Sequence, residues 1–119
     1  MPTDSLEELS ARIHQFAQER DWEQFHSPKN LSMALIVEAA ELLEHFQWLS
    51  QEQSLELSPK KQQEVALEMA DILIYLIRLA DRLDIDLLKA ARQKILLNAK
   101  KYPAQASMGK TERPTEQKL

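Results

Sequence analysis

The chain of 119 residues has no cysteine and a single glycine. The absence of cysteine excludes a disulfide framework, a thiolate nucleophile and a zinc site built on cysteine. One glycine and five prolines leave few places for tight turns, which favours a few long helices over a loop-rich fold. Hydrophobic residues make up 44% of the chain, too many for a disordered protein, and the length is typical of one small domain.

The sequence also lacks an excess of positive charge and any long apolar run. Its net charge of -4 argues against nucleic acid as a partner, because phosphate backbones are held by surplus Lys and Arg. It does not argue against a nucleotide that is held through a cation. No apolar run approaches the roughly 20 residues of a membrane span, and the N-terminus has no signal-peptide pattern. We therefore expect a soluble, cytoplasmic protein with neither nucleic acid nor a membrane as a partner.

Apolar periodicity and helix-start signals predict an all-α fold. Ser27-Pro28 and Ser58-Pro59 are typical of helix N-termini, with serine as the cap and proline in the first turn. The segment between residues 50 and 60 reads as a polar connection. Four helices are predicted, at about residues 4–20, 28–49, 59–83 and 87–102. Residues 1–103 are thus expected to form a single, four-helix bundle-like domain, and residues 104–119 a mobile C-terminal tail.

Acidic side chains occupy unexpected places in two of these helices. In "EAAELLEHFQW", residues 38–48, Glu38 lies at the edge of an apolar stripe and Glu41 follows one turn later. The third helix carries a narrow polar row between two apolar faces, in which Glu68 and Asp71 have the same spacing. The row consists of Glu64, Glu68, Asp71, Tyr75, Arg78 and Arg82. Carboxylates against a core cost several kcal/mol unless something compensates them. Each pair taken alone is more often a solvent-facing pair of helix neighbours.

If the second and third helices face each other, these four carboxylates converge. Only cations would make such a cluster tolerable, and oxygen ligands favour Mg²⁺, with Mn²⁺ as a substitute, over zinc. Glu44 continues the row of the second helix and is either exposed or placed behind the ligands.

Glu38-x-x-Glu41 followed by Glu68-x-x-Asp71 resembles the metal motif of the all-α nucleotide pyrophosphohydrolases, the MazG-like superfamily. The segments "ERDWEQFHSPKNL", "EMADILIYLIRLAD" and "KILLNAKKYP" are similar to its dCTP pyrophosphatase branch, and the likeness covers about residues 5–103. The resemblance implies Mg²⁺-dependent hydrolysis of a nucleoside triphosphate to the monophosphate and pyrophosphate, with the four carboxylates as metal ligands. It also implies a homo-oligomer, a tetramer or a dimer, with sites at or near subunit interfaces.

The expected mechanism assigns further roles to charged and polar side chains. Glu38 or Glu41 is the candidate general base, and the sequence does not distinguish the two. Lys94 and Asn98, one turn apart on the fourth helix, are candidate phosphate contacts, as is Arg82 at the end of the polar row. The alternative for Lys94 and Arg82 is an ordinary surface charge. Tyr75 is expected either to bond a phosphate or sugar oxygen or to be a core residue.

Aromatic residues are the candidates for binding the base. Trp22, His26 and Trp48 offer stacking faces and hydrogen bonds, although tryptophans at helix ends are commonly packing residues. Where this branch has a further upstream histidine, an ungapped comparison places Ile13 rather than His14, which leaves that base contact open.

Three functions remain open from the sequence. The leading one is a nucleoside triphosphate diphosphatase that converts dCTP, or a modified dCTP, to dCMP and pyrophosphate and cleanses the nucleotide pool. The second is a dUTP or broad-specificity NTP pyrophosphohydrolase with the same metal motif. The third is a non-catalytic helical interaction protein that binds metal or nucleotide without turnover.

Overall fold

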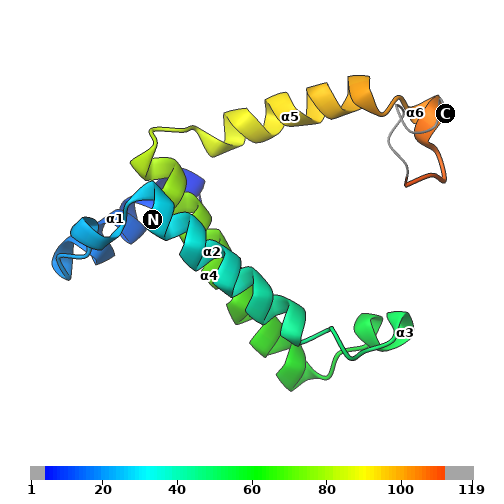
Figure 1. Cartoon of the computed structure of the whole chain (residues 1–119), viewed down its shortest axis with the longest axis horizontal. Coiled ribbons are helices and arrows are strands. Elements are labelled where there is room, and N and C mark those ends of the chain that lie inside the picture. The colour runs from blue at the N-terminus through cyan, green and yellow to red at the C-terminus, as the bar shows by residue number, and fades with distance from the viewer. Residues whose placement is uncertain (1–4, 112–119) are drawn as a thin grey trace. The chain divides into compact units, whose positions relative to one another are not determined.

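The computed structural model describes residues 5–111, and within that range all regular structure is helical (Figure 1). The expected all-α class is confirmed. The elements in chain order are α1 (Leu6–Glu19), the 3-10 helix η1 (Glu23–Phe25), α2 (Pro28–Glu44), α3 (Gln51–Leu55), α4 (Pro59–Arg82), α5 (Leu87–Lys101) and α6 (Ala104–Ser107). No helix of the described range is both long and apolar enough to cross a membrane.

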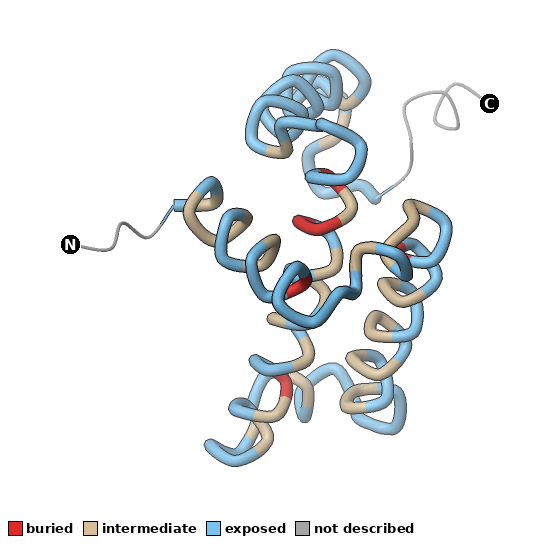
Figure 2. Tube along the Cα trace, turned by 90° about the vertical axis from the view of Figure 1, so that its left-hand side faces the viewer, coloured by how far each residue is buried: buried red, intermediate tan, exposed pale blue. Residues whose placement is uncertain are grey.

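The chain divides into two compact units, residues 1–84 and 85–119. In the first unit α2 and α4 pack side by side as an antiparallel pair, and α1 contacts α4 less extensively (Figure 1). The buried apolar residues of the described range are few and scattered along these helices (Figure 2). They are Ala17, Leu31, Val65, Ile77 and Ala80.

The second unit consists of α5 and α6 as far as the structure describes it. The helix α5 begins at the predicted cap, where the Asp86 carboxylate accepts a hydrogen bond from the Lys89 N–H at 3.0 Å. It contains no buried residue. The expected tail includes one helical turn, α6, and its residues 112–119 lie outside the described residues. A single domain over residues 1–103 stays a prediction.

The serine caps place the two central helices where the sequence predicts them. The hydroxyl oxygens of Ser27 and Ser58 accept the backbone N–H groups of Asn30 (3.1 Å) and Lys61 (3.2 Å). The predicted end of α2 at residue 49 was wrong, because the helix stops at Glu44 and residues 45–48 form turns. The N–H groups of His45 and Phe46 donate to carbonyl oxygens three residues earlier in the chain.

The polar connection between α2 and α4 also differs from the expectation, because it contains the helix α3. Ser50 and Gln53 form a capping box in which each side chain bonds the other residue's backbone N–H, at 3.1 and 2.9 Å. This reciprocal pair satisfies two N–H groups at the start of a very short helix.

A residue in the left-handed backbone conformation follows the end of α1 and turns the chain toward the next helix. Asp21 has φ 53°, and the Trp22 N–H reaches back to the Ala17 carbonyl at 2.9 Å. The Asp21 N–H bonds the Gln18 carbonyl at 3.1 Å, which completes a Schellman motif. Glycine usually occupies this position, and here an aspartate does so. The motif fixes where Trp22 and η1 leave α1.

Replacing Asp21 by Gly and by Ala separates backbone strain from side-chain contacts. Both variants lose the same hydrogen bond, which the Asp21 carboxylate accepts from the Gln24 amide at 3.2 Å. Of the two substituted residues only alanine has a Cβ atom, which makes a positive φ unfavourable. Asp21→Gly should therefore be more stable than Asp21→Ala by about 1 kcal/mol. Urea unfolding at one protein concentration measures the difference, and equal stabilities would contradict the assigned strain.

Candidate functional site

Three carboxylates meet between the two central helices. Glu38 and Glu41 of α2 and Glu68 of α4 each offer an oxygen, and these oxygens lie within 4.8 Å of one another. All three residues are half-buried. The α2–α4 pairing therefore brings together acidic groups that are about 30 positions apart in the sequence.

The protein does not supply a hydrogen-bond partner for every oxygen of this cluster. One carboxylate oxygen of Glu38 and one of Glu68 are buried without a hydrogen-bond partner. Burial, a hydrogen bond with Glu41 and the charges of Glu41, Asp71 and Glu68 together raise the pKa of Glu38 to about 7, and burial is the largest of these causes. A buried polar atom without a partner costs about 1–3 kcal/mol. Orphaned oxygens in an all-oxygen donor set fit a hard divalent cation such as Mg²⁺ or Mn²⁺.

Asp71 lies at the margin of this cluster. It is exposed and is not among the three residues whose oxygens share the 4.8 Å sphere, although its charge reaches Glu38. Glu44, the last residue of α2, is exposed. The structure thus brings three of the four predicted metal ligands together and leaves the fourth nearby, and their role as ligands stays a prediction.

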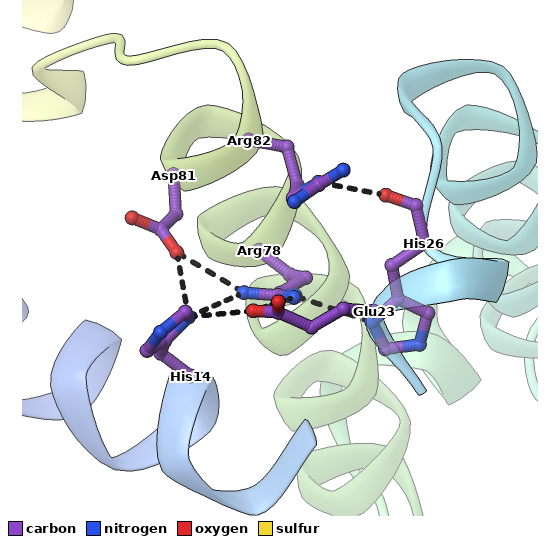
Figure 3. A network of polar contacts seen from close by, with 6 residues as sticks. All are labelled: His14, Glu23, His26, Arg78, Asp81 and Arg82. Carbon is purple, nitrogen blue, oxygen red and sulfur yellow. Dashed lines mark hydrogen bonds and ion pairs between the residues drawn. The ribbon is translucent and has the colours of Figure 1, made fainter. Parts of the chain in front are cut away.

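A second polar cluster surrounds Arg78, farther along α4 (Figure 3). Arg78 is only 2% exposed. Its Nε–H donates to His26 Nδ1 at 3.1 Å, and its two terminal nitrogens donate to Asp81 Oδ2 at 3.1 Å and Glu23 Oε1 at 3.3 Å. His14 Nδ1 lies 3.0 Å from Arg78 Nη1 and 3.3 Å from Glu23 Oε1. The cluster ties α1, η1 and α4 together.

Sequence reasoning missed this cluster. Arg78 was recognised only as a member of the polar row on α4. The one local signal is the spacing of three residues between Arg78 and Asp81, which is common on helices. The partners from α1 and η1 are more than 50 residues away in the sequence, and no periodicity connects them to Arg78.

His26 and Arg82 belong to the rim of the second cluster. Burial lowers the pKa of His26, and the charges of Arg78 and Arg82 lower it as well, against the opposing charge of Glu23. The Arg82 Nε–H donates to the backbone carbonyl of His26 at 3.1 Å. Arg82 is therefore already engaged with the protein, and its predicted contact with phosphate stays a prediction.

The predicted base-binding aromatics are placed in different ways. The rings of Trp22 and His26 make an edge-type contact with centroids 6.2 Å apart, and Trp22 is 42% exposed. Trp48 lies on the turn after α2 and is 86% exposed. Tyr75 is half-buried on α4 between the two polar clusters. Trp22 and His26 are thus neighbours, whereas Trp48 extends from another part of the unit.

Two further polar residues lie at the start of α2, and the predicted phosphate contacts lie on α5. The Asn30 amide donates to the Phe25 carbonyl at 3.0 Å, a local contact that links η1 to α2, and Lys29 is exposed. Lys94 and Asn98 are exposed on α5, in the second unit, and their contacts with phosphate stay predictions.

The comparisons with known proteins all find the same kind of protein similar to this chain. Residues 33–116 match the model of the MazG-like family. The chain is 42% identical over 110 residues to dCTP pyrophosphatase 1 of Rattus norvegicus, covering 91% of the chain and 65% of the rat protein. It is 39% identical over 117 residues to dCTP pyrophosphatase 1 of Homo sapiens, covering 97% of the chain and 69% of the human protein. The curated relatives are therefore longer than the chain.

A solved structure shares the fold over almost its whole length. The crystal structure of a pyrophosphatase from Archaeoglobus fulgidus superposes with a TM-score of 0.80 at 38% identity. The match covers 87% of this chain and 96% of the archaeal one.

Neutralising Glu38 should have opposite effects with and without a divalent cation. In chelator at pH 8, above the raised pKa of Glu38, Glu38→Gln removes one of three clustered negative charges, so the variant should be more stable than the parent chain by about 1 kcal/mol. In excess Mg²⁺ the order should reverse, because the variant has lost a ligand and gains less from the ion. Thermal unfolding at one protein concentration measures both.

Glu64→Gln is the matched control, since Glu64 lies on the same row of α4 and forms only an exposed ion pair with Lys61 at 3.8 Å. It should change stability by a few tenths of a kcal/mol in either buffer. If Glu38→Gln behaved like this control in both conditions, the cluster would not be a cation site.

Proposed function

Because the chain belongs to the MazG-like family, we propose that it is a divalent-cation-dependent nucleoside triphosphate pyrophosphohydrolase that converts dCTP, or a modified dCTP, to the monophosphate and pyrophosphate. The observation that carries the proposal is the cluster of Glu38, Glu41 and Glu68, with two carboxylate oxygens that lack partners. The names of the rat and human relatives support dCTP as the substrate.

The residues suited to hold the cation are Glu38, Glu41, Glu68 and the adjacent Asp71. A bound Mg²⁺ would offset the charge of the phosphate oxygens and make a water ligand acidic enough to attack at neutral pH. In the proposed reaction a water molecule forms a bond to the α-phosphorus, the bond between the α-phosphorus and the bridging oxygen breaks, and pyrophosphate leaves. A carboxylate of Glu38 or Glu41 takes the proton of the water.

The rest of the nucleotide extends along the polar row of α4. Tyr75 follows Asp71 by one turn and is the proposed contact of a sugar or phosphate oxygen. Trp22 and His26, beside the Arg78 cluster, are the proposed contacts of the base. Lys94 and Asn98 from α5 are the proposed phosphate contacts, and Trp48 is a further wall of the base pocket.

The proposed enzyme is a homo-oligomer, a dimer or a tetramer. Large apolar side chains remain exposed on both central helices: Ile36 of α2 is 67% exposed and Leu67 of α4 is 59% exposed. Extensive apolar surface of this kind marks a protein–protein interface. Val37, Leu43, Met69, Leu73 and Ile74 add to it. A second copy of the chain would cover these faces and supplement a core that is small in one copy.

Pyrophosphate release from a panel of nucleotides tests the reaction and the substrate together. With Mg²⁺, dCTP-type substrates should react fastest, and in water enriched in ¹⁸O the label should enter the monophosphate, because water attacks the α-phosphorus. Equal rates for all bases would reject the cytosine preference. Label in pyrophosphate would reject the site of attack, and the absence of release from every nucleotide would reject the enzyme.

Substituting single carboxylates tests their roles in the same assay. Glu41→Gln and Asp71→Asn should each lower kcat at least about a hundredfold, since a cation ligand or the base is lost. Glu64→Gln should retain the parent rate. Circular dichroism checks that helicity is unchanged. A normal rate in Asp71→Asn would remove this marginal residue from the metal set.

Placing a charge on the exposed apolar face of α4 tests the assembly. Leu67→Lys should shift the species in solution toward a single copy, because burying an ammonium group at an interface is costly. Sedimentation equilibrium measures the mass. Gln18→Lys, which adds the same charge at an exposed polar position of α1, is the control. An oligomer in which Leu67→Lys leaves the mass unchanged would exclude this face as the interface.

A further inference from the structure

The geometry around Arg78 defines the protonation of His26. A guanidinium group has N–H donors and no acceptor, so the nitrogen that it faces must supply a lone pair. Arg78 Nε lies 3.1 Å from His26 Nδ1. The neutral ring of His26 therefore carries its proton on Nε2, and Nε2–H is its one remaining hydrogen-bond donor.

Arg78 is itself held in place. Its buried charge is matched by the carboxylates of Glu23 and Asp81, at 3.3 and 3.1 Å. His14 Nδ1 lies 3.0 Å from Nη1, the nitrogen that also donates to Asp81. These partners come from α1, η1 and α4 itself (Figure 3). Because the guanidinium is planar and its donors point in fixed directions, this set of acceptors fixes its orientation and hence the direction of Nε–H.

The charges around His26 keep the ring neutral. Arg78 and Arg82 face it from α4, Glu23 faces it from η1, and His14 of α1 lies across Arg78. Burial and the two guanidinium charges lower the pKa of His26, and only Glu23 acts in the opposite direction. A lowered pKa means that the neutral ring persists to a lower pH than in a histidine with the ordinary pKa of 6.5.

We propose that Arg78 is a positioning residue that locks His26 as the Nε2–H tautomer, so that His26 donates one hydrogen bond to an acceptor atom of the base. This inference rests on the proposed function. It is consistent with the place of His26 beside Trp22, the proposed stacking surface. A donor that meets N3 fits cytosine, whose N3 is an acceptor, better than uracil, whose N3 carries a hydrogen, whereas O2 accepts in both bases.

Nuclear magnetic resonance of the full chain tests the lock without nucleotide or turnover. Two-bond ¹H–¹⁵N spectra should show His26 with a bare Nδ1 and a protonated Nε2 at pH 7. In Arg78→Met, which retains much of the side-chain stem, both tautomers should appear and the pKa of His26 should rise toward 6.5. Arg12→Met, which removes an exposed guanidinium from α1, should leave the His26 signals unchanged. An unchanged tautomer in Arg78→Met would overturn the proposal.

Two substitutions of His26 test the donor while leaving Arg78 in place. The amide of Gln sits where Nε2 lies and keeps a donor, whereas Asn offers an oxygen near Nδ1 for Arg78 and has no donor at the Nε2 position. His26→Asn should therefore raise KM for dCTP about tenfold with little change in kcat, and His26→Gln should stay near the parent KM. A purely structural histidine would give the opposite order, because His26→Gln loses the contact with Arg78.

These outcomes separate the inference from the proposed function. No turnover of any nucleotide by the parent chain would remove both the proposed function and the role of His26 toward the base, while the spectra would still decide whether Arg78 sets the tautomer. Turnover with a parent-like KM in His26→Asn would overturn the proposal and leave the pyrophosphohydrolase intact.

Discussion

Repulsion among the carboxylates between α2 and α4 is the constraint on which the candidate site depends. Packing these helices puts Glu38, Glu41 and Glu68 within one small sphere, although each would be more stable in water. Every neighbour that shifts the pKa of Glu38 raises it, so within the described residues no side chain offsets the repulsion there. The fold therefore maintains an acidic site whose missing positive charge must come from outside the chain.

At the other end of α4 the protein itself neutralises a buried charge. Arg78 is more deeply buried than any of the acidic residues, yet Glu23 and Asp81 balance its charge, and each of its three side-chain nitrogens has a partner. Ten residues separate Glu68 from Arg78, or about 15 Å along the helix. One helix thus presents an acidic cluster that suits a cation, which in turn would bind phosphates. Farther along, the same helix carries a cluster that orients His26. A nucleotide lying along α4 would meet both.

Local signals in the sequence predicted much of this arrangement. Ser27-Pro28 and Ser58-Pro59 begin the two central helices because each serine caps its own helix, which needs no tertiary contact. The capping box of α3 was equally local and was overlooked, because the segment is polar and short. Spacing predicted the carboxylate pairs, but the second residue of a pair is rotated by about 60° from the first, and Asp71 lies outside the tight cluster. The Arg78 cluster depends on tertiary packing and was not predictable from any one segment.

The location of a bound cation tests the central claim most directly. A crystal of the chain grown with Mn²⁺ can be measured at a wavelength at which manganese scatters anomalously. The ion is then identified by its own scattering and not by the protein atoms around it. We predict a peak between α2 and α4 within about 2.0–2.3 Å of oxygens from Glu38, Glu41 and Glu68. Manganese bound only elsewhere, with these three carboxylates in contact with water alone, would contradict the account.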